Sequence, residues 1–199
     1  MSASIIVGPI SLRDEFCERN TVPAEYEVKI LEIDPERVAA LILSKGGLQV
    51  SSATLQRRCV YDITPGDQSK WIRVRDNGRA VTLAVKEIAH DGIDGTNEVE
   101  VTVDDFAVAN ELLGMLGFSS KAYQENRRTS FTLDGGRLEI DEWPMLTPYL
   151  EIEADTPEDV KRIADLLGFE ESQMTSENTT KVYANSGIDL AGIAQLRFS

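Results

Sequence analysis

The sequence predicts an α+β fold in which an eight-stranded antiparallel β-barrel encloses a tunnel and helices pack on the outside. Three stretches, 24–31, 98–103 and 149–153, alternate apolar with polar residues and place glutamates two positions apart. Side chains on a strand point to opposite faces with a period of two, so each stretch predicts a strand with one charged face. Each is followed by an aspartate and a helical stretch that ends at glycine. About eight strands with mostly antiparallel connections favour a closed barrel, because closure leaves no exposed strand edge.

The chain begins with a segment that carries no clear period. We expect residues 1–23 to form an extension of uncertain order. The remainder, 24–199, contains no linker or low-complexity tract, which predicts a single domain. Its first strand covers about 24–32. A helix follows, with Asp34 as its N-cap and Pro35 at the first helical position, and a pair of glycines ends it.

The later elements follow from the same signals. Two alternating runs flank Asp76-Asn77-Gly78, which is a strong signal for a β-hairpin, and Asp134-Gly135-Gly136 marks a second one. The expected elements are a strand at 54–63, hairpin strands at 70–76 and 79–87, a strand at 98–103, a helix at 105–117, hairpin strands at 121–134 and 136–142, a strand at 149–153, a helix at 157–168 and a short helix near 176–184.

The helices decide which strand face points outward. Their apolar stripes must pack on some strand face, and only the apolar faces can receive them. The charged faces then line the lumen. The alternative, with charged faces in solvent and an apolar core, is the ordinary arrangement of an antiparallel sheet. The predicted interior carries the basic residues Lys29, Arg57, Arg73, Arg75, Lys86 and Arg128 and the acidic residues Glu25, Glu27, Glu98, Glu100, Glu139, Asp141, Glu151 and Glu153.

The strand at 54–63 leaves one choice open. If Val60 lies on the apolar side, Arg57 faces the tunnel, whereas Arg58 is the competing choice. Burying so many charges without partners would be prohibitive. We therefore expect a wet tunnel that binds both a polyanion and divalent cations.

Composition excludes several classes of partner. The 199 residues carry 34 acidic and 20 basic side chains, a formal net charge of -14, which disfavours binding to nucleic acid or to an anionic membrane. Cys17 and Cys59 form neither a disulfide framework nor a zinc pattern. No segment is long and apolar enough for a membrane helix, and we expect a soluble, cytoplasmic protein. The oligomeric state is open, with a homodimer as one option.

The ordered set of charged motifs resembles the CYTH family, the triphosphate tunnel metalloenzymes that include class IV adenylyl cyclases and thiamine triphosphatases. The ExExK signature of the family corresponds to Glu25-Tyr26-Glu27-Val28-Lys29. The later motifs correspond to residues 71–75, 82–86, 98–100, 124–128, 139–144 and 149–153. ExExK alone is a weak signal, whereas the complete ordered set over residues 24–199 is specific.

The resemblance implies a tunnel that binds a triphosphate together with Mg²⁺ or Mn²⁺. The implied metal ligands are Glu25, Glu27, Glu151 and Glu153, with Glu100 and Asp141 nearby, and the implied phosphate contacts are Lys29, Arg57, Arg73, Arg75, Lys86 and Arg128. Lys29 is also the implied catalytic residue, which would orient or help to deprotonate the nucleophile.

Three functions are compatible with this site. The first is metal-dependent hydrolysis of inorganic triphosphate or of an organic triphosphate. The alternatives are a cyclase that forms cyclic AMP and pyrophosphate from ATP, and a non-catalytic module that binds polyphosphate or nucleotides. Two departures from the family count against the cyclase: Asn126 replaces a basic residue, and the single histidine, His90, lies in a loop. Trp71 and Trp143 are expected to pack between helices and strands rather than against a ligand.

Overall fold

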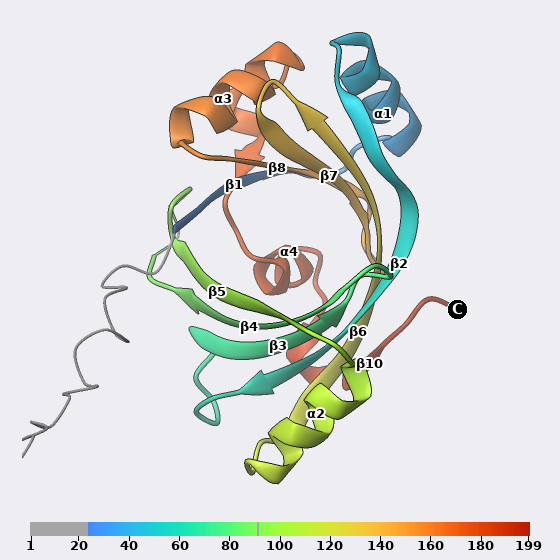
Figure 1. Ribbon diagram of the computed structural model, residues 1–199. Coiled ribbons are helices and arrows are strands. Elements are labelled where there is room, and N and C mark those ends of the chain that lie inside the picture. Colours follow the sequence, from blue (N-terminus) through green and yellow to red (C-terminus); the bar gives the residue numbers. More distant parts are fainter. Residues whose placement is uncertain (1–23, 91) are drawn as a thin grey trace, which may run out of the picture.

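The computed structural model describes residues 24–90 and 92–199, and its strands form a ring with helices around it (Figure 1). The long strands are β1 (Ala24–Ile30), β2 (Leu48–Asp62), β3 (Lys70–Asp76), β4 (Val81–Ile88), β5 (Thr96–Val103), β6 (Ser120–Leu133), β7 (Gly136–Glu142) and β8 (Tyr149–Ala154). The short strands are β9 (Met174–Thr175) and β10 (Gln195–Leu196), and the helices are α1 (Pro35–Ser44), α2 (Phe106–Met115), α3 (Pro157–Leu166) and α4 (Thr179–Asn185). Residues 1–23, expected to be an extension, lie outside the described residues.

The predicted eight-stranded antiparallel barrel is confirmed. The order round the ring is β6-β2-β3-β4-β5-β1-β8-β7, and pairing between β7 and β6 closes it. The shortest strand pairing in the ring is between β1 and β5, which pair only at Ala24↔Asn97 and Glu25↔Thr96. The two short strands are additions to this ring, because β9 pairs with β1 and β10 lies parallel to β6.

The three outer helices form at the predicted positions, and each begins with a side-chain cap. Asp34 Oδ1 accepts hydrogen bonds from the backbone N–H groups of Glu36 and Arg37, and Pro35 opens α1. Asp105 caps α2 and Thr156 caps α3 in the same way. Gly117 and Gly168 follow α2 and α3 with φ of 93° and 81°, the left-handed conformation that glycine adopts without strain.

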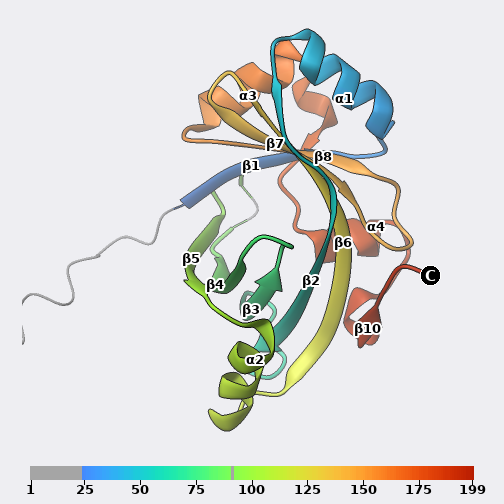
Figure 2. The same cartoon turned by 45° about the vertical axis from the view of Figure 1, so that its right-hand side comes forward.

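The apolar faces of the strands point outward against these helices, as predicted. α1 and α3 lie over β1, β7 and β8, and α2 lies against the opposite side of the ring (Figure 2). One core joins Ile42 of α1 and Ile163 of α3 to Leu138 and Ile152 of the sheet. A second core packs Leu113 of α2 against Val74 of β3. The charged strand faces are therefore left to the interior of the ring.

Ile152→Ala tests the contribution of the outer core to stability. Ile152 is fully buried, so we expect the free energy of unfolding in urea to fall by about 2–5 kcal/mol. Val101→Ala is the control, since Val101 is half exposed on β5 and should change the same quantity by less than about 0.5 kcal/mol. Equal losses in the two variants would contradict this assignment of the core.

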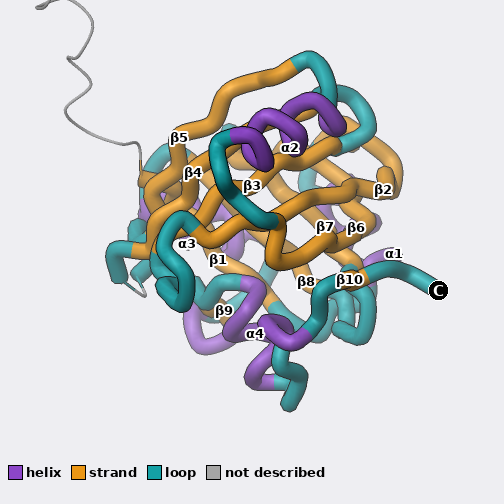
Figure 3. The backbone as a smooth tube through the Cα atoms, turned by 90° about the horizontal axis from the view of Figure 1, so that it is seen from below, coloured by secondary structure: helices purple, strands orange, loops and turns teal. Residues whose placement is uncertain are grey.

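The C-terminal segment that contains α4 covers one opening of the ring. α4 lies at the opposite side of the barrel from α2 when the molecule is seen from below (Figure 3). Tyr183 of α4 is fully buried, makes an edge contact with Trp143 and donates a hydrogen bond to the carbonyl of Pro144 at 2.7 Å. The short helix expected near 176–184 is thus confirmed. Among the described residues, no helix combines the length and apolar content needed to cross a lipid bilayer.

Candidate functional site

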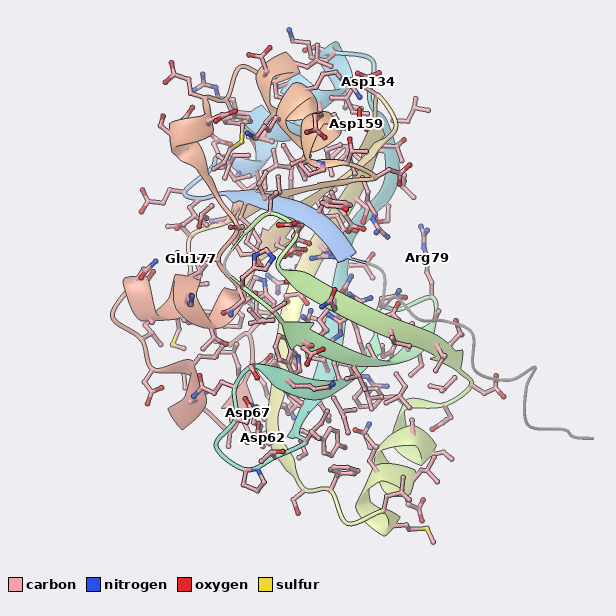
Figure 4. All side chains as sticks on the ribbon, turned by 90° about the vertical axis from the view of Figure 1, so that its left-hand side faces the viewer. Asp62, Asp67, Arg79, Asp134, Asp159 and Glu177 are labelled. Atoms are coloured by element: carbon pink, nitrogen blue, oxygen red, sulfur yellow. The ribbon has the colours of Figure 1, made fainter. Side chains whose placement is uncertain are left out.

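The interior of the ring holds a cavity of about 560 Å³. Asn77 and Arg79, at the β3–β4 turn, line one end of it, and Asn178 to Lys181, at the start of α4, line the other. Arg79 lies on the opposite side of the molecule from Glu177, the residue just before this segment (Figure 4). The cavity therefore runs through the barrel between the two ends.

Most of the predicted site residues line this cavity together. They are Glu27, Lys29, Arg73, Arg75, Lys86, Glu100, Arg128, Glu151 and Glu153. The strand register explains why they meet, since Glu27 and Lys29 of β1 lie directly opposite Glu153 and Glu151 of β8. The side chain of Glu25 lies outside the described residues.

Lys29 is the most deeply buried cation of the site, with 2% of its side chain exposed. Its Nζ donates to Glu27 Oε1 at 2.7 Å and lies 3.4 Å from Glu151 Oε2. Burial alone would lower the pKa of Lys29, but Glu27 and Glu151 outweigh burial and raise the pKa above its usual range. The ammonium group therefore stays protonated and links carboxylates from two strands.

Arg128 is held by three carboxylates. Its Nε donates to Asp141 Oδ1 at 2.8 Å and its Nη2 lies 3.1 Å from Glu151 Oε1, and it also pairs with Glu139. Burial opposes the charge of Arg128, yet Asp141 and Glu151 raise its pKa well above the usual value. Asp141 is fully buried and does not line the cavity. The structure thus places Asp141 as the support of Arg128 rather than among the groups that face a ligand.

The other half of the ring carries a second charged group. Arg73 Nη2 donates to Glu98 at 2.6 Å and to Glu100 at 3.0 Å, and Arg75 Nη2 donates to Glu100 at 3.1 Å. Lys86 Nζ lies 3.0 Å from Glu98. Burial and the neighbouring Arg73 and Arg128 lower the pKa of Arg75 to about 10, in spite of Glu100.

The placement of Arg57 in the tunnel is wrong, and Arg58 takes that position. Arg57 is half exposed on the outside, where it pairs with Asp76 at 3.0 Å and lies over the ring of Phe106. Arg58 lines the cavity, and Thr54, Gln56 and Val60 of the same strand face line it too, so the period of two is intact over this part of β2. The condition that Val60 lies on the apolar side is not met, because Val60 faces the cavity whereas Cys59 and Tyr61 pack in the outer core.

Several lining residues had no place in the predicted site. Arg137 of β7 lines the cavity and pairs with Glu153, although its side chain is more than half exposed. Trp143 packs against Tyr183 of α4, as expected, and also contributes to the cavity wall. Trp71 lines the cavity too, a position that was not expected of it. Trp71 lies two residues before Arg73, so a period of two places both side chains on the same strand face. The period alone therefore predicts that Trp71 faces the cavity.

The walls of the cavity contain polar atoms without partners. The Nε–H groups of Arg58, Arg73 and Arg75 are buried and make no hydrogen bond within the described part of the chain. Buried donors normally find acceptors, because leaving one unpaired costs about 1–3 kcal/mol. Three guanidinium donors in one cavity indicate a site for an anion with several oxygens.

The acidic side of the cavity carries the type of ligand atom that divalent cations prefer. Glu27 lies directly opposite Glu153, and Glu139 directly opposite Glu151, in the strand registers. Carboxylates in such positions repel unless a cation lies between them, and carboxylate oxygen is the ligand that Mg²⁺ and Mn²⁺ prefer. Within the described residues no three such donors converge closely enough to hold a metal ion, and their oxygens pair with Lys29, Arg128 and Arg137. Metal binding would exchange these partners.

Glu151 should make the metal-free protein sensitive to acid. Burial alone would raise the pKa of Glu151, but Lys29, Arg128 and Lys86 lower it below the ordinary value of 4.5. The unfolded chain then binds more protons in acid, so stability falls as the pH drops below about 4.5. We expect Glu151→Gln to flatten this part of the stability–pH curve, measured by urea unfolding with a chelator present. An unchanged slope would contradict the depressed pKa.

The fold and the cavity define a class of protein: an antiparallel barrel whose bore is lined by paired acidic and basic residues. The chain belongs to the CYTH family, since the model of the CYTH domain matches residues 23–183. No curated protein matches the chain.

Solved structures share the fold at low identity. A protein from Pyrococcus horikoshii OT3 is 23% identical with a TM-score of 0.67, over 79% of this chain and 98% of its own. A candidate adenylate cyclase from Vibrio parahaemolyticus is 12% identical with a TM-score of 0.69, over 82% and 99%. A candidate adenylyl cyclase from Hippeastrum, for which a dominant triphosphatase activity is described, is 19% identical with a TM-score of 0.56, over 82% and 96%.

Proposed function

We propose that this chain is a divalent-metal-dependent triphosphatase that binds the triphosphate of its substrate inside the barrel. The observation that carries this proposal is the set of buried, unpaired guanidinium donors of Arg58, Arg73 and Arg75. They line the same cavity as the opposed carboxylates Glu27 and Glu153. A ligand that brings both a polyanion and cations would satisfy both groups. Membership of the CYTH family and the activity described for the Hippeastrum relative support the same reaction.

The roles of the residues follow from their chemistry. Arginine holds phosphate through two parallel hydrogen bonds, and lysine acts as a point charge. Arg58, Arg73, Arg75, Lys86 and Arg128 bind phosphate oxygens, and Glu27, Glu151 and Glu153, with Glu25 and Glu100, hold Mg²⁺ or Mn²⁺. A divalent cation held by these carboxylates would supply charge neutralisation for the phosphate and activation of the attacking water. Lys29 keeps Glu27 and Glu151 in position and donates to the reacting phosphoryl group or orients the nucleophile.

The test is release of orthophosphate from inorganic triphosphate in the presence of Mg²⁺ or Mn²⁺. We expect release to stop with a chelator and with Glu27→Gln. Glu87→Gln is the matched control, because Glu87 is an exposed partner of Lys70 that does not line the cavity. Release that persists both with the chelator and in Glu27→Gln would reject the proposal.

A cyclase is the second candidate, favoured by the description of the Vibrio parahaemolyticus relative as a candidate adenylate cyclase. The same residues would then bind ATP, and the ribose 3′-hydroxyl would be the nucleophile. Incubation with ATP separates the two: orthophosphate supports the hydrolase, and cyclic AMP with pyrophosphate supports the cyclase. Tight binding without turnover under any metal would instead identify a non-catalytic binding module.

A further inference from the structure

Arg58 differs from the other deeply buried cations of the bore. Lys29, Arg73 and Arg128 each pair with at least two carboxylates. Arg58 is also buried, with 8% exposed, and among the described residues no carboxylate oxygen lies within ion-pair distance of it. Its Nη2 donates to the amide oxygen of Asn126 instead, and its Nε–H has no partner. The buried guanidinium of Arg58 therefore has no carboxylate partner among the residues that the structure describes.

Asn126 is the residue that keeps Arg58 apart from a carboxylate. It is fully buried and uses both ends of its amide, because Oδ1 accepts from Arg58 while Nδ2 donates to Asp141 Oδ1 at 2.9 Å. Asp141 in turn accepts from Arg128 Nε at 2.8 Å. A neutral amide thus joins Arg58 to the Asp141–Arg128 pair without giving Arg58 a counter-charge. An aspartate of the same shape at this position would supply that charge.

The surroundings of Arg58 favour an anion. Arg58 lies directly opposite Arg75 in the β2–β3 register, and like charges in such positions repel. Burial, together with Arg73, Arg75 and Arg128, lowers the pKa of Arg58 to about 9, although Asp141 acts in the opposite direction. The guanidinium is fixed in orientation, since it lies 4.6 Å from the centre of the Trp143 ring. Its free Nε–H and that of Arg75 are both buried in the cavity wall.

We propose that Asn126 is a positioning residue that keeps Arg58 free of any carboxylate, so that Arg58 and Arg75 form a seat for one phosphoryl group that fills without a divalent cation. At Lys29, Arg73 or Arg128 an incoming phosphate must displace a carboxylate or arrive with a metal ion. At Arg58 it displaces no carboxylate, and at Arg75 only the single bond from Nη2 to Glu100 competes with it. The identity of the anion as a phosphoryl group rests on the proposed function, whereas the absence of a carboxylate beside Arg58 does not.

The experiment measures binding of inorganic triphosphate by calorimetry in the presence of a chelator. The unmodified chain should bind, and Asn126→Asp should weaken binding by about 10-fold or more, the usual effect of losing a hydrogen bond to a charged group. Arg58→Gln should cause a similar loss without introducing a charge, so it tests the seat even if Asn126→Asp unfolds. Urea unfolding of each variant establishes that it is folded.

Gln195→Glu is the matched control. The Gln195 amide oxygen accepts hydrogen bonds from Arg197 at 2.9 and 3.1 Å. Gln195 does not line the cavity, so this variant replaces an amide beside an arginine with a carboxylate, as Asn126→Asp does, but outside the site. It should bind triphosphate as the unmodified chain does.

Unchanged binding in folded Asn126→Asp or Arg58→Gln would overturn the inference. If the unmodified chain bound no triphosphate without metal but hydrolysed it with metal, the inference about Arg58 would be overturned and the proposed triphosphatase function would stand. If it bound triphosphate without metal, both variants weakened that binding and no metal supported hydrolysis, the inference would stand and the triphosphatase function would be rejected.

Discussion

Replacing Lys29 with methionine should lower kcat/KM for triphosphate hydrolysis by about 10²–10³-fold, the usual effect of removing one positioned donor from a buried charge-stabilising site. The Nζ of Lys29 is buried, lies within 3.4 Å of carboxylates from two strands and faces the cavity. Methionine preserves the length and apolar stem of lysine but removes the charge. The loss should occur mainly in kcat, because Lys29 acts on the reacting group more than on substrate affinity.

Lys70→Met provides the comparison for this measurement. Lys70 is partly exposed, pairs with Glu87 at 3.5 Å and does not line the cavity. Its steady-state kinetics should match those of the unmodified chain. A folded Lys29→Met variant that retained more than about a tenth of the activity would contradict this prediction, because removal of a positioned donor usually costs more.

Arg128→Met should destabilise the protein by about 3–5 kcal/mol, because removing one partner of a buried ion pair leaves the other charge uncompensated. Asp141 is fully buried and accepts two hydrogen bonds from Arg128, and Glu139 and Glu151 would also lose a cationic partner. The measurement is urea unfolding at neutral pH with a chelator present, so that a metal ion cannot replace the lost charge.

Arg57→Met is the control for stability. Arg57 makes an ion pair of similar length with Asp76, but its side chain is half exposed, and such pairs contribute at most about 1 kcal/mol. The variant should also retain triphosphatase activity, because Arg57 lies outside the cavity. Equal destabilisation by the two substitutions would show that burial of the Arg128 cluster is not what makes it important.

The barrel and most of its charged interior could be predicted because two independent regularities agreed. The period of two divided each strand into faces, and the helices required the apolar face, so the position of residues such as Glu27, Arg75 and Glu153 followed. The register of β1 with β8 then brought Glu27 and Glu153 face to face. Regular strands carry this information in the sequence alone.

The residues that were misplaced lie where both faces of a strand carry apolar residues or where tertiary packing decides. Arg57 and Arg58 are adjacent on β2, where Val60 lines the cavity and Tyr61 packs in the outer core, so hydrophobicity does not identify the outer face. Asp141 has the period of a lining residue, but Arg128 and Asn126 hold it within the wall. The role of Asn126 depends on contacts with Arg58 and Asp141, 68 and 15 residues away in the chain. No local pattern in the sequence records such contacts.

Acidic side chains pair with most of the buried basic side chains of the bore, Arg58 excepted, and this pairing has a thermodynamic consequence. A metal ion that takes Glu27, Glu151 and Glu153 releases their cationic partners, and a triphosphate that takes those cations releases the carboxylates. Each ligand therefore prepares the site for the other, and linkage requires that each increases the affinity of the other by the same factor. We expect positive cooperativity between two ligands of opposite sign, within one barrel and without any movement of its backbone.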